Sequence, residues 1–413
     1  MIGETLPGEM LLDDISYKRS RVAIVSYPWV SKVPYKFLSE LLQILEPITD
    51  RIVLIDGNTD RIENTSEKVE LRDIATSMHA ANDIRPAFYS KLLWLMRCIK
   101  AQLRASIELV RIRREVDVVL FYLAYPFYLA PLLTAKLLRK KAVEVVTYSR
   151  SAEKKYVNTW IFRLQDRIMF SLLDGISPES KGVLNAVDLK KRGVDLKKHE
   201  HKILTEGSRF VDTSRFRVTT KFEDRDLVVG YIGRLDNGKG IKELVEAIPQ
   251  IAKNKRISFL IGGSGECLAE VKKASERMDA EEAVSLMVPG WIEEEELPIL
   301  LNALRLFILP THRGEGLPTI ILEAMACGTP VLATPVGAIP DVIINEVTGF
   351  LLESTTPECI AQRTTMILNY TELEKVADNA ESLIRLKFTK TAATERYDKM
   401  LKEVLVDLRS TTV

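Results

Sequence analysis

Short apolar runs alternate with amphipathic stretches along most of the chain. The apolar runs of the first half, each typical of a buried strand, lie at residues 21–30, 50–56, 116–122 and 142–149. The stretch at 37–45 has the spacing of a helix between two such strands. This β-α-β order predicts a doubly wound domain built on a parallel sheet.

The second half repeats the pattern at shorter intervals. Its apolar runs lie near residues 227–232, 256–262, 284–289, 304–310, 330–334 and 349–352. The chain after residue 357 is predicted to be helical, with a closing helix at 392–408. We therefore predict an α/β protein with two Rossmann-like, doubly wound parallel-sheet domains that face a cleft.

The stretch at residues 309–337 holds the most specific chemistry. A predicted buried strand is followed by a polar loop at 311–316. Pro318 then marks the start of a predicted helix, and Gly328 lies just past its end. The N-terminus of such a helix presents free backbone amides and partial positive charge at the carboxyl end of a parallel strand. This arrangement predicts a site for a phosphate or pyrophosphate.

Two carboxylates flank that helix N-terminus. Glu315 precedes the helix and Glu323 lies within it, one turn after Thr319. Carboxylates accept hydrogen bonds from hydroxyl-rich groups such as sugars. The alternative is that Glu315 interacts with the helix dipole and Glu323 is a solvated helix residue.

Cations follow the first strand of the second half. Gly233 ends that strand, and Arg234 and Lys239 lie five residues apart across a turn, so both can reach one pyrophosphate. Gly263 lies in a glycine-rich loop where a ligand can approach the backbone, although such a loop alone is weak support. The alternative for Arg234 and Lys239 is an ordinary exposed pair in a turn.

A basic amphipathic segment occupies residues 84–114. Its basic residues are Lys91, Arg97, Lys100, Arg104, Arg111, Arg113 and Arg114. Such a helix can lie on anionic lipid, and the alternative is a helix packed on the core with a solvated basic face.

The run at 118–135 has no charged residue and is just long enough for a transmembrane helix. Pro126 and Pro131 instead favour a strand followed by a helix. The N-terminal residues 1–16 lack the basic and apolar regions of a secretory signal. We therefore predict a cytoplasmic protein, with peripheral contact at the inner membrane face left open.

Composition excludes several classes of function. The 413 residues include 58 Lys plus Arg and 57 Asp plus Glu. The chain therefore lacks the excess of positive charge that would favour nucleic-acid binding. The four cysteines lie far apart without metal-ligand spacing, which favours reduced thiols. We expect neither a metal ion nor a resident cofactor.

The motif EGLPTIILE followed by AMACGTPVLAT resembles the nucleotide-sugar signature of glycosyltransferase family four, whose members are retaining enzymes with the GT-B fold. The resemblance implies that Glu323 holds the donor ribose, and that Glu315 and the backbone of Gly316, Leu317, Pro318 and Thr319 face the donor sugar and phosphates. It also fits Gly233, Arg234 and Lys239, and no Asp-x-Asp metal motif stands in the expected place.

The interdomain connection of the family resembles residues 205–216, although Glu206 replaces an expected asparagine. From this we predict domains at 1–205 and 206–390, with 391–413 a helix that crosses back to the first domain. The first domain departs from the family. Tyr27 to Ser31 replace a glycine-rich loop, and a Thr-x-His pattern reads Thr147, Tyr148, Ser149. Only Ser149 and Arg150 remain as acceptor-side candidates.

The resemblance implies a retaining transferase that moves a hexose-type sugar from a nucleotide diphosphate sugar to a hydroxyl of a glycan or lipid-linked acceptor. Glu315, Arg234 and Lys239 would then carry catalysis. Two alternatives remain at this point: a nucleotide-sugar epimerase of the same architecture, and a nucleotide-sugar-binding protein without turnover.

Overall fold

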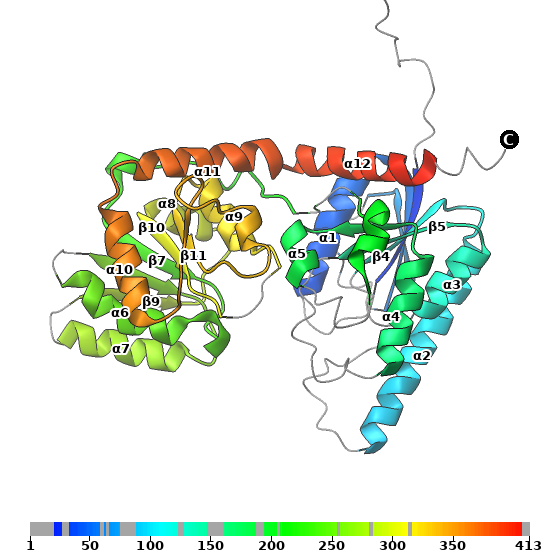
Figure 1. Cartoon of the computed structure of the whole chain (residues 1–413), viewed down its shortest axis with the longest axis horizontal. Helices are drawn as coiled ribbons and strands as arrows, with labels where there is room; N and C mark the ends of the chain where they lie inside the picture. The colour runs from blue at the N-terminus through cyan, green and yellow to red at the C-terminus, as the bar shows by residue number, and fades with distance from the viewer. Residues whose placement is uncertain are drawn as a thin grey trace, which may run out of the picture.

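A computed structural model gives the fold of the chain (Figure 1). It describes residues 20–26, 33–57, 62, 66–74, 88–122, 128–146, 160–186, 194–204, 207, 209–253, 257–280, 284–312 and 316–406. Two parallel sheets of six strands lie in two domains side by side, bridged along one edge by the last two helices. The α/β architecture predicted from the alternating pattern is confirmed.

The first sheet has the order β3-β2-β1-β4-β5-β6. Its strands are β1 (Ser20–Val25), β2 (Thr49–Asp56), β3 (Val69–Asp73), β4 (Val118–Tyr122), β5 (Lys141–Val146) and β6 (Gly175–Pro178). Its helices are α1 (Val33–Leu45), α2 (Phe88–Arg111), α3 (Leu129–Leu137), α4 (Trp160–Leu172) and α5 (Lys181–Ala186). The run at 118–135 is thus β4 followed by α3, as the two prolines favour.

Alternate residues of each strand face opposite layers of helices, because successive side chains of a strand point to opposite sides. Val22 and Ile24 pack with residues of α1, whereas Ala23 and Val25 pack with residues of α2, α3 and α4. Both faces of the sheet are therefore buried. This explains why β1 and β4 contain continuous apolar runs rather than alternating patterns.

The second sheet has the order β12-β11-β10-β7-β8-β9. Its strands are β7 (Val228–Ile232), β8 (Ser258–Gly262), β9 (Ser285–Gly290), β10 (Leu306–Leu309), β11 (Val331–Ala333) and β12 (Phe350–Leu351). Its helical elements are η6 (Asn237–Lys239), α6 (Ile241–Ala252), α7 (Leu268–Ala280), α8 (Leu297–Ala303), α9 (Thr319–Ala326), η7 (Ile339–Asp341), α10 (Pro357–Leu368) and α11 (Leu373–Lys387). All six strands predicted for this half are present.

The last helix, α12 (Lys390–Val406), leaves the second domain and packs on the first (Figure 1). Its buried residues Ala393, Tyr397, Met400 and Leu401 join the core that α1 forms with the first sheet. The domain limits at 205 and 390 remain predictions.

Two further features bear on the sequence analysis. All four cysteines are free thiols, and Cys98, Cys267 and Cys327 are buried. Within the described part of the chain, no helix has the length and apolarity needed to cross a membrane.

Candidate functional site

The predicted donor residues gather where the strand order of the second sheet reverses. β7 pairs with β8 on one side and with β10 on the other, with Leu306 opposite Val229. In doubly wound sheets, ligands bind at such a switch point, outside the carboxyl ends of the strands. The β7–α6 connection carries Gly233, Arg234 and Lys239, and the β10–α9 connection carries residues 310–318.

The β7–α6 connection is a rigid turn. The Tyr231 hydroxyl donates a 2.7 Å hydrogen bond to the carbonyl of Arg234, and the Lys239 amide donates to the carbonyl of Asp236 at 2.9 Å. The Arg234 guanidinium is 74% exposed and pairs with Asp236 at 2.6 Å, and Lys239 is half-buried in η6. One short turn thus holds both cations predicted for the diphosphate.

This turn is locked against the start of the β10–α9 connection. The His312 amide and the Thr311 hydroxyl donate to the carbonyl of Gly238 at 3.0 and 3.2 Å. Gly240 has a φ of +72°, and a Cβ there would lie 2.0 Å from the carbonyl oxygen of Pro310. Only glycine allows this approach, which holds Lys239 beside the connection that leads to α9.

Gly263 has a φ of +133°, and a Cβ there would lie 1.8 Å from the carbonyl oxygen of Gly233. Its amide donates to the carbonyl of Gly290 at 2.6 Å. The backbone of Gly263 thus lies close to the backbone of Gly233. This contact alone explains why residue 263 is a glycine, and no ligand is needed for the explanation. A role for Gly263 in donor binding remains a prediction.

Helix α9 begins at Thr319, with Pro318 in the capping position and no side-chain hydrogen bond to the first turn. Ile321 and Met325, four residues apart on one face of the helix, are fully buried. Gly316 and Leu317 lead into the helix, whereas Glu315 lies outside the described residues. The acceptor-side candidates Ser149 and Arg150 also lie outside them.

A carboxylate of the first domain reaches this connection. Glu179 follows β6, is fully buried, and accepts a hydrogen bond from the Leu317 amide at 3.4 Å. Its other oxygen forms an ion pair with the buried Arg209, whose Nη1 lies 3.6 Å from Glu40 of α1. The Arg209 guanidinium also lies 3.6 Å from the centre of the Phe37 ring.

Burial is the main cause of the pKa shifts of the two carboxylates in this cluster. It raises the pKa of Glu179 to about 7, against the attraction of Arg209, and it also raises the pKa of Glu40. Sequence analysis did not select Glu179, Arg209 or Glu40. One signal in the sequence could have indicated Glu179: it is a charged residue within DGISPES, directly after an apolar strand. A carboxylate buried at such a position needs a partner.

Two more links join the domains near the site. Lys36 of α1 pairs with Glu294 of the β9–α8 connection at 3.3 Å. The Gly182 amide of α5 donates to Asp341 of η7 at 2.6 Å. Together with the Glu179 contact, these links place the first domain directly against the β10–α9 connection.

Glu323 lies near this interface on α9. Burial raises its pKa to about 7, and Lys36 opposes the rise. Among the residues that the structure describes, none forms a hydrogen bond or ion pair with its carboxylate. Glu323 therefore has acceptor capacity available for a ligand. Its role in binding the donor ribose remains a prediction.

This pKa predicts how nucleotide affinity depends on pH. The ionised carboxylate is the stronger acceptor, so affinity should be full above about pH 7 and fall towards tenfold per pH unit below it. Calorimetric titrations with a nucleoside diphosphate from pH 5.5 to 8.5 measure this. Glu323→Gln is the control. The nucleotide affinity of this variant should depend less on pH than that of the wild type, and the same pH profile in both proteins contradicts the assignment.

His312 is held within the second domain. Its Nε2 lies 3.0 Å from Glu243 of α6, and its Nδ1 lies 2.8 Å from the Thr355 hydroxyl. Both ring nitrogens are thus used in fixing the β10–α9 connection. The structure also holds no cluster of three potential metal ligands among its described residues.

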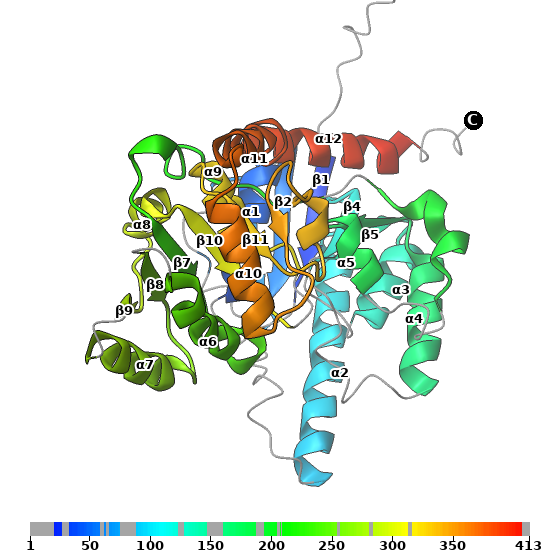
Figure 2. The same ribbon diagram turned by 60° about the vertical axis from the view of Figure 1, so that its left-hand side comes forward.

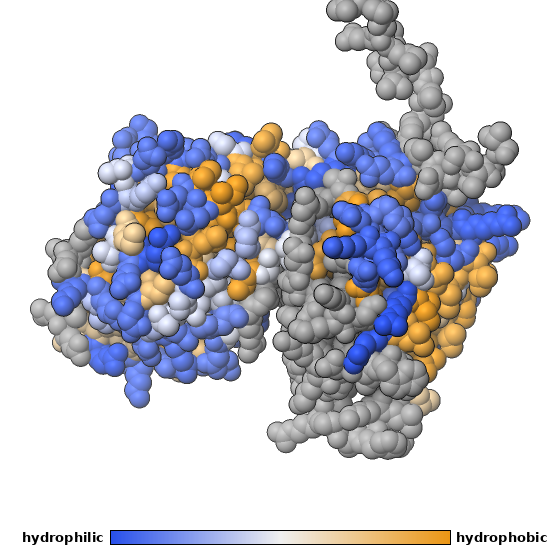
Figure 3. All heavy atoms as spheres, in the orientation of Figure 1, coloured by the Kyte–Doolittle hydropathy of each residue, from blue (hydrophilic) through white to orange (hydrophobic). Residues whose placement is uncertain are grey.

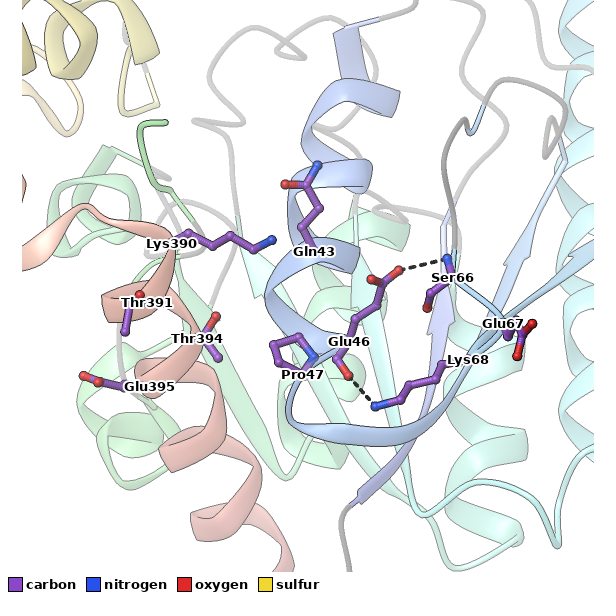
Figure 4. Close-up of a pocket in the computed structure, with 10 residues that line it drawn as sticks. All are labelled: Gln43, Glu46, Pro47, Ser66, Glu67, Lys68, Lys390, Thr391, Thr394 and Glu395. Atoms are coloured by element: carbon purple, nitrogen blue, oxygen red, sulfur yellow. Dashed lines mark hydrogen bonds between the residues drawn. The ribbon is translucent and has the colours of Figure 1, made fainter. Parts of the chain in front are cut away.

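A cavity of about 760 Å³ lies away from these residues (Figure 4). It is formed by the end of α1, the residues before β3 and the start of α12. Lys68 on its wall donates to the carbonyls of Glu46 and Thr49 at 3.0 and 3.1 Å, and the Ser66 amide donates to Glu46. None of the predicted donor residues lines it.

Comparison with known families identifies residues 212–382 as a match to the family model described as glycosyl transferases group 1. The match covers 171 residues in the second half of the chain. The matched segment contains β7 to α10 and most of α11, and therefore every predicted donor residue.

Curated glycosyltransferases match slightly less than half of the chain. An uncharacterized glycosyltransferase of Methanocaldococcus jannaschii is 24% identical over 192 residues, which is 46% of this chain and 48% of that protein. The capsular polysaccharide biosynthesis glycosyltransferase CapM of Staphylococcus aureus is 28% identical over 188 residues, 45% of this chain and 48% of CapM. The similarity thus spans about half the length of these curated relatives.

Solved structures match over both domains. A glycosyltransferase from Rickettsia africae has a TM-score of 0.70 at 18% identity, covering 94% of this chain and 99% of that one. Anabaena HepE, in complex with UDP, has a TM-score of 0.67 at 15% identity, covering 93% of this chain and 100% of HepE. At such identities the likeness shows the GT-B fold.

Proposed function

We propose that this protein is a retaining glycosyltransferase that moves a hexose-type sugar from a nucleotide diphosphate sugar to an acceptor hydroxyl. One observation carries the proposal. The β7–α6 turn with Arg234 and Lys239 is locked to the β10–α9 connection at the switch point of the second sheet. This arrangement supports joint binding of one diphosphate by the cations and the amides at the start of α9.

Charge on the leaving group explains how these residues would act. As the bond between the sugar and the diphosphate breaks, negative charge develops on the phosphates. In this proposal Arg234, Lys239 and the backbone amides of residues 316 and 319 stabilise that charge in the transition state. The Leu317 amide, which donates to Glu179 in the structure, would have to exchange that partner for the phosphate. This chemistry needs no metal ion in our proposal.

The other donor contacts follow from the same placement. We assign the ribose hydroxyls to Glu323 and the sugar to Glu315, with Gly233 and Gly263 shaping the floor of the site. Solved HepE complexes contain UDP and UDP-glucose, which makes UDP-glucose the first donor to test.

The two alternative functions have less support. An epimerase needs acidic and histidine groups around the sugar, and both nitrogens of His312 already have partners. A binding protein without turnover fits the absent family histidine at residues 147–149, but the match of residues 212–382 to the group 1 family model favours a transferase.

We place the acceptor among glycans and lipid-linked glycans. Its recognition would fall to the first domain, with Ser149 and Arg150 as candidates. CapM is named for capsular polysaccharide biosynthesis, and WcaL relatives are named for colanic acid biosynthesis. Both names fit a glycan acceptor.

Turnover of UDP-glucose followed by proton NMR tests this function. We expect slow hydrolysis, and faster transfer when acceptor is supplied, with an initial product that keeps the anomeric configuration of the donor. An inverted product contradicts a retaining transferase. A nucleotide sugar epimerised without loss of nucleotide supports the epimerase, and binding without any turnover supports the silent protein.

A further inference from the structure

Helix α2 has two apolar faces, and only one of them is buried. Cys98, Ala101, Ala105 and Leu109 pack on the first sheet. On the outer side, a row of large apolar side chains is between 44% and 58% exposed: Met96, Ile99, Leu103, Ile107 and Val110. Their spacing of three, four, four and three residues places them on one stripe of the helix.

The stripe continues over the two neighbouring helices. α3 packs against α2, and α4 packs against α3. Leu133 and Leu137 of α3 and Leu164 and Ile168 of α4 are also exposed, Leu137 to 84%. Figure 3 shows this apolar surface in orange at the right-hand edge of the first domain. Single exposed leucines are ordinary, but nine large apolar side chains on three adjacent helices are not.

Basic residues border these apolar side chains. Arg97, Lys100 and Arg111 are exposed on α2 beside the stripe, and Arg163 and Arg167 are exposed on α4. Glu108 is the single acidic residue of α2, and it pairs with Arg111 at 2.5 Å. An apolar stripe next to a cationic face is the pattern of helices that lie in the surface of an anionic bilayer.

We propose that the surface formed by these nine apolar residues and their five basic neighbours, the α2–α4 surface, docks the protein onto a lipid bilayer with anionic headgroups. The charge pattern selects this occupant over a second copy of the chain. Two copies joined through this surface would bring their basic residues together, and like charges repel. Anionic headgroups neutralise the same residues.

The docking surface also has a defined relation to the proposed function. α2 is about 36 Å long at 1.5 Å per residue, and it extends well beyond the sheet in two views (Figures 1 and 2). Along the chain α2 is the next described element after β3, so it begins on the side of the carboxyl ends of the first sheet. Resting on the proposed function, this geometry would offer the site a lipid-linked acceptor from the bilayer plane.

Flotation of the full chain with vesicles tests the docking independently of catalysis. We expect binding to vesicles of phosphatidylcholine with 30% phosphatidylglycerol, and roughly tenfold weaker binding to pure phosphatidylcholine or in high salt. The double variant Leu103→Glu with Ile107→Glu should lose at least about tenfold in binding to the anionic vesicles. Met287→Glu, at an equally exposed apolar position on β9 of the second domain, is the matched control and should bind like the wild type.

Each further outcome is decisive. Equal flotation of the wild type and the Leu103→Glu, Ile107→Glu variant overturns the proposal, as does failure of the wild type to bind anionic vesicles. If the wild type forms a concentration-dependent dimer that this variant abolishes, without vesicle binding, the surface is an interface between copies. Donor hydrolysis without acceptor should be unchanged in the variant, which separates this test from that of the proposed function.

Discussion

Lys239→Ala is expected to lower the affinity for a nucleoside diphosphate by about 10- to 100-fold. A hydrogen bond to a charged group contributes about 1.5 to 3 kcal/mol, and each 1.4 kcal/mol is a factor of ten in affinity. The melting temperature should stay near that of the wild type, because Lys239 is only half-buried. Isothermal titration calorimetry measures the affinity, and a thermal melt measures the stability.

Lys242→Ala provides the matched control. Lys242 lies three residues further along in the first turn of α6, and it pairs with Glu270 of α7 at 3.1 Å. It is the same residue type on the same connection, directed towards a different helix. Equal losses in the two variants would show a general electrostatic effect rather than contact of Lys239 with the diphosphate.

Glu179→Leu is expected to produce the largest loss of stability. It removes one carboxylate from the buried Arg209 and leaves Glu40, 3.6 Å away, as the remaining partner. Removing one member of a buried ion pair costs about 3 to 5 kcal/mol. For a domain of this size, each kcal/mol lowers the melting temperature by roughly 2 to 4 °C, so the fall should be clear in a thermal melt.

The double variant Glu179→Leu with Arg209→Met tests whether the unpaired charge is the cause. Replacing both members of a buried ion pair by apolar residues is often close to neutral. The double variant should therefore melt above Glu179→Leu. If it melts lower, the loss comes from packing and not from an uncompensated guanidinium. Glu179→Gln should lose less stability than Glu179→Leu, because its amide oxygen can still accept from the Leu317 amide.

Much of the fold followed from the pattern of apolar residues. Strands buried on both faces are continuous apolar runs, so β1, β4, β7 and β10 were visible in the sequence. β3 was not, because Val69–Asp73 is a short edge strand whose sequence VELRD alternates charged with apolar residues. An edge strand needs only one neighbour and carries charge without penalty, which removes the signal.

Part of the candidate site was equally accessible. The start and stop residues of α9, Pro318 and Gly328, and the spacing of Arg234 and Lys239 are local sequence patterns. Such patterns can be interpreted without knowing the fold. The contact of Glu179 with Leu317 spans 138 positions and depends on how two domains meet. The exposed stripe on α2 was also hidden, because periodicity showed an amphipathic helix without showing which apolar residues the sheet covers.

A thermal-shift titration of the wild-type chain with UDP, GDP and ADP tests the central claim most directly. A ligand at a hundred times its dissociation constant stabilises the folded state by about 2.7 kcal/mol. The account predicts that one nucleotide raises the melting temperature in a concentration-dependent way, and that Lys239→Ala largely loses this rise at the same concentrations. If no nucleoside diphosphate stabilises the wild type at millimolar concentration, the donor site at the switch point of the second sheet is contradicted.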